Sequence, residues 1–163
     1  MALSLKAQQL RKRMVHPLLY RFWVFVKLPA AAFAGVMLRE LEEGRCVVSI
    51  PYGWRSQNPF QSIYFAVQAM AAELSTGALV VMHTADQPFS TLILDIKGTF
   101  GKKAVSTVWF TCEGGAAVVQ AVAEAVATGE PRTVALETVG KMADGTEVSR
   151  FVFTWSIKAR KPR

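Results

Sequence analysis

One stretch constrains this fold more than any other: residues 57–82, which read QNPFQSIYFAVQAMAAELSTGALVVM and contain a single charged residue, Glu73. Asn58 is a typical N-cap residue, and Pro59 suits the first helical position, where a missing N–H costs nothing. The stretch therefore predicts one long helix. Because the surface of this helix is almost entirely apolar, the rest of the chain must wrap around it.

The predicted helix has two different faces at helical spacing. One face carries the large apolar residues Ile63, Val67, Met70 and Leu74. The other carries small residues and one carboxylate, namely Ser62, Ala66, Ala69, Glu73 and Thr76. Small side chains allow a backbone, a partner helix or a ligand to approach, so we expect Glu73 to lie in apolar surroundings. Gly77 either ends the helix or lies within it at a cost of about 1 kcal/mol.

Composition limits the classes of protein that this chain can form. Its 163 residues are 52% hydrophobic, which suits one domain with a sizeable core. Lys and Arg number 19 against 12 Asp and Glu, giving a formal charge of +7. This excess favours anionic ligands: cofactor phosphates, nucleic acid or acidic lipid. We expect no nucleic-acid partner, because basic and aromatic residues are not interleaved as in RNA-binding sheets.

The cysteines and histidines suggest a structural role. Cys46 and Cys112 both lie in apolar, strand-like runs, which predicts buried reduced thiols in a cytoplasmic protein, although a disulfide between them remains an alternative. His16 and His83 are too few and too isolated for a metal site. We therefore predict no bound metal.

The first 38 residues allow several interpretations. Residues 3–15 predict a short basic amphipathic helix. Residues 18–38 are mostly apolar and nearly long enough to span a bilayer, but Arg21 and Lys27 interrupt them and Pro29 divides them. We favour a helix over 17–27 that covers the core, with residues 28–34 as a connection to the first strand. The alternatives are a signal peptide and docking of residues 1–38 on acidic lipid.

The remaining chain predicts six strands and a second helix. The strands are expected at 36–41, 45–50, 90–100, 104–113, 132–141 and 147–158, and the helix at 114–128. Leu92, Leu94 and Ile96 alternate with polar residues, which predicts one buried face, and residues 101–103 read as the following turn. Residues 1–34 are expected to form a helical segment, 35–158 the main domain and 159–163 a basic tail.

Six antiparallel strands around one long helix give an α+β fold. This order resembles the hotdog superfamily, in which a sheet wraps a long central helix. Within it, residues 16–157 resemble a thioesterase-like group of unknown function and, more remotely, the phenylacetate-pathway acyl-CoA thioesterases. The resemblance rests on the element order, on Asn58-Pro-Phe before the helix, and on a late helical carboxylate, Glu73.

The resemblance implies a catalytic arrangement for some of these residues. In those thioesterases an Asn precedes the helix, a His-Gly-Gly run opens it, and an Asp or Glu follows two to three turns later. Asn58 matches the Asn and Glu73 matches the acid, but Tyr64-Phe65-Ala66 replaces the His-Gly-Gly run. The glycines in those enzymes let the backbone approach the thioester, and Phe65 would crowd that approach.

The function implied is acyl-CoA thioesterase activity at a homodimer interface, and a dimer of dimers is left open as a further assembly. Coenzyme A is then part of the substrate, and no separate cofactor is needed. Glu73 would serve as general base or nucleophile, with its pKa raised by apolar surroundings, and Asn58 would orient water or the carbonyl. Residues expected to bind substrate are Phe60, Gln61, Ser62, Tyr64 and Phe65, together with Arg55, Lys102 and Lys103 for the phosphates.

Each of these roles has a plainer alternative. Glu73 can pair with an arginine across a dimer, and Asn58 can be a helix cap alone. The basic residues can simply form a solvated face. The whole tunnel can hold an acyl chain or acyl-CoA without turnover, which is the main alternative function.

Overall fold

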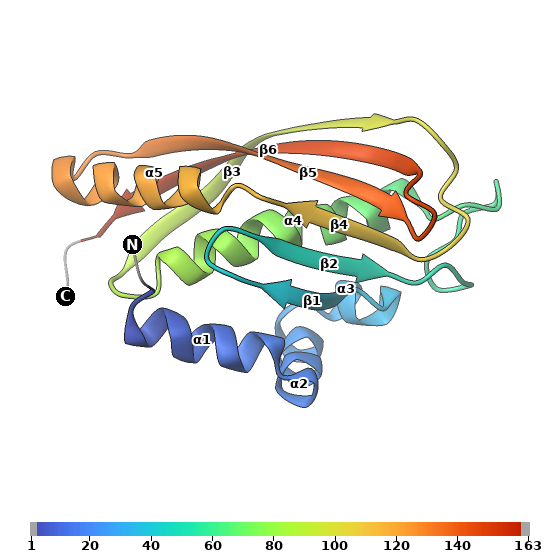
Figure 1. The fold of residues 1–163 in the computed structure, drawn as a ribbon, viewed down its shortest axis with the longest axis horizontal. Coiled ribbons are helices and arrows are strands. Elements are labelled where there is room, and N and C mark those ends of the chain that lie inside the picture. Colours follow the sequence, from blue (N-terminus) through green and yellow to red (C-terminus); the bar gives the residue numbers. More distant parts are fainter. Residues whose placement is uncertain (1–2, 161–163) are drawn as a thin grey trace.

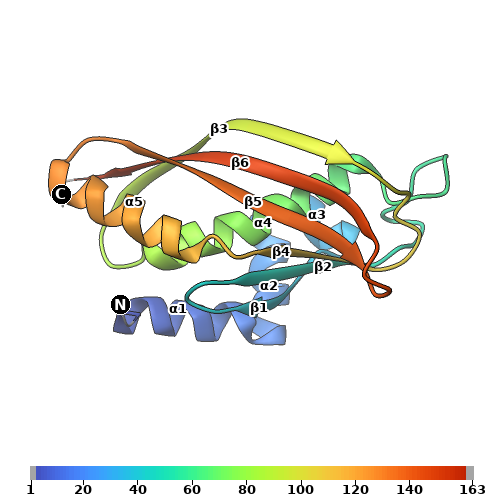
Figure 2. The same cartoon turned by 45° about the horizontal axis from the view of Figure 1, so that its top comes forward.

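The computed structural model describes residues 3–160. Six strands form one antiparallel sheet in the order β1-β2-β4-β5-β6-β3, curved around helix α4 (Figures 1 and 2). The predicted α+β hotdog arrangement is therefore confirmed. In chain order the elements are α1 (Leu5–Val15), α2 (Pro17–Lys27), α3 (Pro29–Ala34), β1 (Met37–Leu41), β2 (Cys46–Ile50), α4 (Phe65–His83), β3 (Phe89–Phe100), β4 (Val108–Cys112), α5 (Gly115–Thr128), β5 (Arg132–Met142) and β6 (Glu147–Ala159).

Helix α4 begins six residues later than the Asn58 cap predicted. Its N-cap is Tyr64, and Asn58 instead organises the preceding loop, where its Oδ1 accepts a hydrogen bond from the Phe60 N–H at 2.9 Å. The N–H of Ile63 donates to the Ala104 carbonyl at 2.8 Å. Because the Ile63 N–H is bonded to a distant loop and not to a helical carbonyl, the helix begins only after residue 64. The amides of residues 60–63 therefore belong to a loop and not to the helix.

Helix α4 continues without interruption through Gly77 and forms the centre of the core. It is long and apolar enough to cross a membrane by length and composition, yet 67% of its most apolar window is buried inside the fold. Hydrogen bonds attach it to the sheet: Ser75 Oγ donates to Thr138 Oγ1 at 2.8 Å, and Ser149 Oγ donates to Gln68 Oε1 at 2.7 Å. These buried bonds fix both the height and the rotation of α4 against β5 and β6.

The N-terminal segment forms three helices beside β1, the strand at one border of the sheet (Figure 1). The segment 28–34, expected as a connection, contains helix α3, with Pro29 in its first turn and Gly35 at φ 81° after its end. Both residues suit those positions, so the sequence carried the signal. The Tyr20 hydroxyl donates to the Val36 carbonyl at 3.1 Å and anchors α2.

Strand β3 differs from the predicted half-buried strand. A bulge between Ile93 and Asp95 changes its phase, so Leu92 pairs with Ser156 while Ile96 pairs with Phe153. Since neighbours on β6 alternate between faces, Leu92 and Ile96 point to opposite sides of the sheet. Leu92, Leu94 and Ile96 are all exposed. The expectation of one shared, buried face was wrong because alternation cannot reveal a bulge.

The segment after β3 is not a hairpin turn. Strand β3 lies at the border of the sheet, whereas β4 lies between β2 and β5, so residues 101–107 cross from one strand to the other over the end of the sheet. At the C-terminus, Ala159 belongs to β6 and the Arg160 N–H donates to the Pro88 carbonyl at 2.9 Å. The rest of the predicted basic tail, 161–163, lies outside the described residues.

The two cysteines face each other in the core. Cys46 of β2 is the direct register partner of Cys112 of β4, and both are buried and free. Burial raises the pKa of the Cys46 thiol above its ordinary value. The prediction of buried reduced thiols is confirmed.

Candidate functional site

An open, largely apolar face lies between α4 and β3. Helix α4 packs mainly against β2, β4 and β5 and makes few contacts with β3. The inward-pointing β3 residues Ile96 and Phe100 are consequently more than half exposed, at 54% and 52%. On the helix side this face is lined by the predicted small-residue stripe, of which Ala66, Ala69 and Glu73 are half-buried. We call this surface the α4–β3 face.

Glu73 is the ionisable group at the centre of the helix side of this face. An added Cβ at Gly77, one turn later, would lie 3.1 Å from Glu73 Oε1 and 3.3 Å from the Trp155 ring. The carboxyl group therefore lies over Gly77 and beside Trp155. Within residues 3–160 it forms no hydrogen bond or ion pair. Burial without a compensating charge raises the pKa of Glu73 above its ordinary value.

Trp155 is held by its own hydrogen bond. Its indole Nε1 donates to Thr76 Oγ1 at 3.1 Å, which fixes the ring against α4. Trp155 and Gly77 were not among the predicted site residues. Gly77 carried a signal, because it follows Glu73 by one helical turn and a glycine inside a helix is destabilising relative to alanine.

Aromatic rings connect the start of α4 to the end of β3. Phe65 lies 4.8 Å from Tyr64 and 6.5 Å from Phe100, measured between ring centroids. Phe100 in turn contacts Phe151 edge to face at 5.5 Å. Tyr64 and Phe65, both predicted to bind substrate, thus border the α4–β3 face and add apolar surface to it.

The loop before α4 brings several predicted residues together, with roles that differ from those expected. Asn58 Oδ1 accepts hydrogen bonds from the N–H groups of Phe60 and Ser62 and from Ser62 Oγ. The side-chain oxygen of Asn58 therefore stabilises the loop. Gln61 has a φ of 58°, a left-handed conformation typical of tight turns. In the part of the chain that the structure describes, the Ser62 hydroxyl bonds only to the Asn58 amide and to no base.

The predicted phosphate-binding cations do not all lie together. Lys103 Nζ donates to the Phe60 carbonyl at 3.1 Å, so residues 102–103 lie beside the loop before α4. Lys102 is exposed on the same segment. Arg55 lies elsewhere, with its guanidinium 3.6 Å from the Cβ position of Gly35 after α3. Two of the three cations are thus grouped near the start of α4.

The acid and the free helical amides are separated within one chain. The N–H groups of Phe65 and Ala66 have no hydrogen-bond acceptor among the described residues, and α4 has no side-chain cap. They are the donors that the helix offers to a carbonyl oxygen. Glu73 lies seven residues beyond Ala66, or about 10 Å along the helix axis. Within one chain, Glu73 and these two N–H groups therefore cannot act on the same thioester carbonyl group.

Comparison with known proteins establishes the family. Residues 19–157 match a family described as "Domain of unknown function (DUF4442)". The chain belongs to the DUF4442 family. This confirms the resemblance to the thioesterase-like group of unknown function. No curated protein matches the DUF4442 chain.

Solved structures share the fold of this DUF4442 protein. A Pseudomonas aeruginosa protein of unknown function, described as a probable thioesterase, is 18% identical with a TM-score of 0.74, covering 87% of this chain and 95% of its own. A Haemophilus influenzae thioesterase is 13% identical with a TM-score of 0.66, covering 92% and 95%. A second Pseudomonas aeruginosa thioesterase is 12% identical with a TM-score of 0.64, covering 86% and 93%. At these identities the likeness shows a common hotdog fold.

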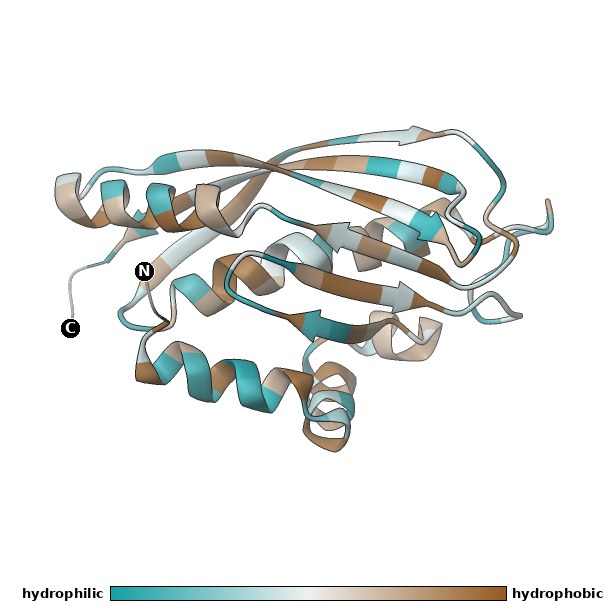
Figure 3. Cartoon of the chain, viewed as in Figure 1, coloured by the Kyte–Doolittle hydropathy of each residue, from teal (hydrophilic) through white to brown (hydrophobic). Residues whose placement is uncertain are grey.

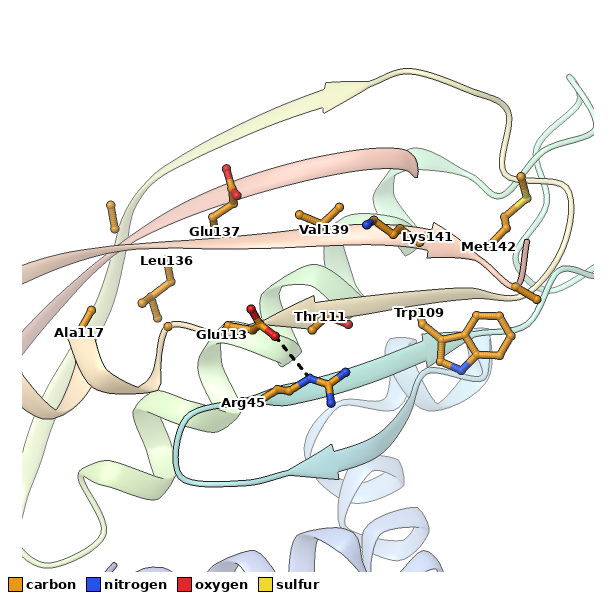
Figure 4. A pocket seen from close by; sticks show the side chains of 13 residues that line it. Arg45, Trp109, Thr111, Glu113, Ala117, Leu136, Glu137, Val139, Lys141 and Met142 are labelled. Carbon is orange, nitrogen blue, oxygen red and sulfur yellow. Dashed lines mark ion pairs between the residues drawn. The ribbon is translucent and has the colours of Figure 1, made fainter. Parts of the chain in front are cut away.

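A pocket of about 860 Å³ in the DUF4442 chain lies away from Glu73 (Figure 4). Its residues Trp109 and Thr111 alternate along β4 with the buried Val108, Phe110 and Cys112, so the pocket is on the sheet face opposite α4. Arg45 and Glu113 pair across it at 3.9 Å. Glu137 and Lys141 also line this pocket, and Glu137 pairs with Arg150.

The raised pKa of Glu73 predicts a pH-dependent effect on stability. As pH rises above about 4, the unfolded chain loses this proton before the folded DUF4442 protein does, so Glu73 makes the fold less stable until the folded carboxyl has ionised as well. Glu73→Gln should therefore be more stable than wild type at pH 7, and the difference should vanish near pH 3. Urea unfolding at both pH values measures it. Glu130→Gln, at an exposed carboxylate, should show no such difference, and an equal gain there would contradict the prediction.

Proposed function

We propose that this protein hydrolyses acyl-CoA or a related thioester at a site shared by two copies of the chain. The observation that carries the proposal is the unpaired carboxylate of Glu73 in the centre of an open apolar face. An acyl chain would lie on the apolar surface between α4 and β3. A carboxyl group with a raised pKa is suited to accept a proton near neutral pH.

The chemistry needs one base and one donor to the carbonyl oxygen. As general base, Glu73 takes a proton from water while the water oxygen bonds to the thioester carbon. The negative charge that develops on the carbonyl oxygen is stabilised by the free N–H groups of Phe65 and Ala66. The carbon–sulfur bond then breaks, and the coenzyme A thiolate takes up a proton. Lys102 and Lys103, near the start of α4, suit the phosphates of coenzyme A.

Two copies are required because the acid and the amides of one chain lie about 10 Å apart along α4. A two-fold axis that sets the two α4 helices antiparallel would place Glu73 of one protomer near the amides of the other. Strand β3 offers the matching contact, since among residues 3–160 it pairs only with β6 and its other edge, Phe89–Phe100, is free of strand partners there. A long apolar edge strand of this kind is usually covered in a native assembly.

We expect Ile96→Asp to convert the dimer to a monomer, because it places a charge in the contact that would bury Ile96. Light scattering at micromolar concentration measures the mass. Leu5→Asp, at an exposed apolar position on α1, is the control and should remain dimeric. A wild-type protein that is already monomeric would contradict the shared site.

The direct test of activity is free-thiol release from a panel of short, long and aromatic acyl-CoAs. Hydrolysis of at least one substrate by the wild-type protein, lost in Ile96→Asp, supports a shared thioesterase site. Phe65 favours the alternative of acyl-CoA binding without turnover, because a bulky residue stands where the related enzymes have glycine. Thermal stabilisation by acyl-CoA without any thiol release would identify that binding function.

A further inference from the structure

Helix α2 presents an apolar face outward. Its buried residues Tyr20 and Val24 point to the core at one-turn spacing. The opposite side, 50–72% exposed, consists of Leu18, Leu19, Phe22, Phe25 and Val26, which we call the α2 face. A surface helix of a soluble protein normally carries polar residues there. Figure 3 shows this hydrophobic colour on α2 at the border of the molecule.

Aromatic residues extend the α2 face on neighbouring segments. Phe33 of α3, which packs against α2, is exposed and contacts the exposed Trp54 edge to face at 5.7 Å. Trp23 lies at the flank of α2. An apolar pocket of about 490 Å³ opens beside Trp23 and Leu19, with Arg13 among its lining residues. Aromatic rings and long cationic side chains around an apolar surface are the composition of membrane-interface segments.

The excess positive charge of the protein is confined to this end of the chain. Residues 1–39 contain seven Lys and Arg and no Asp or Glu, whereas residues 40–163 contain twelve of each. The formal charge of +7 is therefore entirely the charge of residues 1–39. Around the α2 face, Arg13, Arg21 and Lys27 are exposed and take part in no ion pair within the described chain.

We infer that the α2 face docks on the surface of an anionic lipid bilayer. The apolar side chains would enter the boundary between headgroups and acyl chains, and the unpaired cations would contact lipid phosphates. A second copy fits less well, because two α2 faces would bring two clusters of cations together. The β3 edge proposed for dimerisation lies at the other border of the sheet from β1 and the N-terminal helices, so it leaves the α2 face uncovered.

The test is co-sedimentation of the full chain with vesicles. We expect binding to vesicles of phosphatidylcholine with 30% phosphatidylglycerol, little binding to pure phosphatidylcholine, and release at about 1 M salt, where the Debye length falls to about 3 Å. Each cation near an anionic surface contributes about fivefold to partitioning, so Arg13→Gln, Arg21→Gln and Lys27→Gln together should weaken binding about a hundredfold. Equal binding to both vesicle types would overturn the inference.

A matched pair of substitutions tests the apolar contribution. Val26 and Val126 are 55% and 49% exposed, and each lies in the last turn of its helix. Val26→Asp should weaken vesicle binding about tenfold, and Val126→Asp should not. Equal losses in both would overturn the inference. The inference would also be overturned if the wild-type protein did not bind vesicles and Val26→Asp had a lower mass than wild type by light scattering. That result would mean that a second copy of the chain covers the α2 face. The outcome is independent of thioesterase activity.

Discussion

Glu73→Gln is expected to lower kcat for thioester hydrolysis about a thousandfold, within the range that general acid–base catalysis contributes. The amide keeps the shape of the side chain but cannot accept a proton from water. Glu73 is the one acidic residue of α4, so no carboxylate on the same helix can replace it. Free-thiol release measures the rate, and light scattering verifies that the assembly is unchanged.

Two further variants make this result specific. Glu73→Asp keeps the charge but withdraws the carboxylate by about 1 Å, which should cost about a hundredfold through misplacement. Glu130→Gln removes an exposed carboxylate between α5 and β5 and should leave the rate unaltered. Wild-type rates in Glu73→Gln would contradict a catalytic role for Glu73 while leaving the fold and the dimer untouched.

Gly115→Ala is expected to cost about 3 kcal/mol of unfolding free energy, the upper part of the usual range for overpacking. A Cβ at Gly115 would lie 2.2 Å from the Glu43 carbonyl oxygen and 2.5 Å from Gly44 Cα. These are backbone atoms of the β1–β2 turn, so no rotamer change relieves the contact. The Gly115 N–H also donates to the Gly44 carbonyl at 3.1 Å and holds the two segments together.

Thermal and urea unfolding measure this cost, which corresponds to a Tm lowered by about 6–12 °C for a domain of this size. Gly53→Ala is the matched control, because a Cβ at Gly53 meets no atom within 4 Å. An unchanged Tm for Gly115→Ala would mean that the β1–β2 turn moves freely away from α5. In that case the contact between them would not contribute to stability.

Much of the fold could be predicted because its signals are local. Phe151, Phe153, Trp155 and Ile157 alternate along β6 and are all buried, so a period of two is the local signal of this strand. Gly129, at φ 71°, ends α5, and its place shortly before Pro131 is a local stop signal. Glu73 stood out as the one charge of an apolar helix, and its raised pKa agrees with the expected apolar surroundings.

The candidate site was harder to predict because it depends on contacts between distant segments. Asn58 and Glu73 were expected in one helix, yet the Ile63–Ala104 hydrogen bond delays the helix and places Asn58 in a loop. The neighbours Gly77 and Trp155 of the acid come from two elements of the fold. The sequence contains the one-turn spacing of Glu73 and Gly77 locally, but no local pattern contains the delayed start of α4 or the contact of Glu73 with Trp155.

The sequence by itself determined which segments form helices and strands and which helix lies at the centre, because periodicity and capping act over a few residues. Only the tertiary structure decided that β3 bulges at Leu94, that its inner face stays open beside α4, and that the apolar side of α2 faces outward. Strand register, sheet order and uncovered surface are set by hydrogen bonds and packing between residues far apart in the chain. These long-range interactions produce both the α4–β3 face and the α2 face.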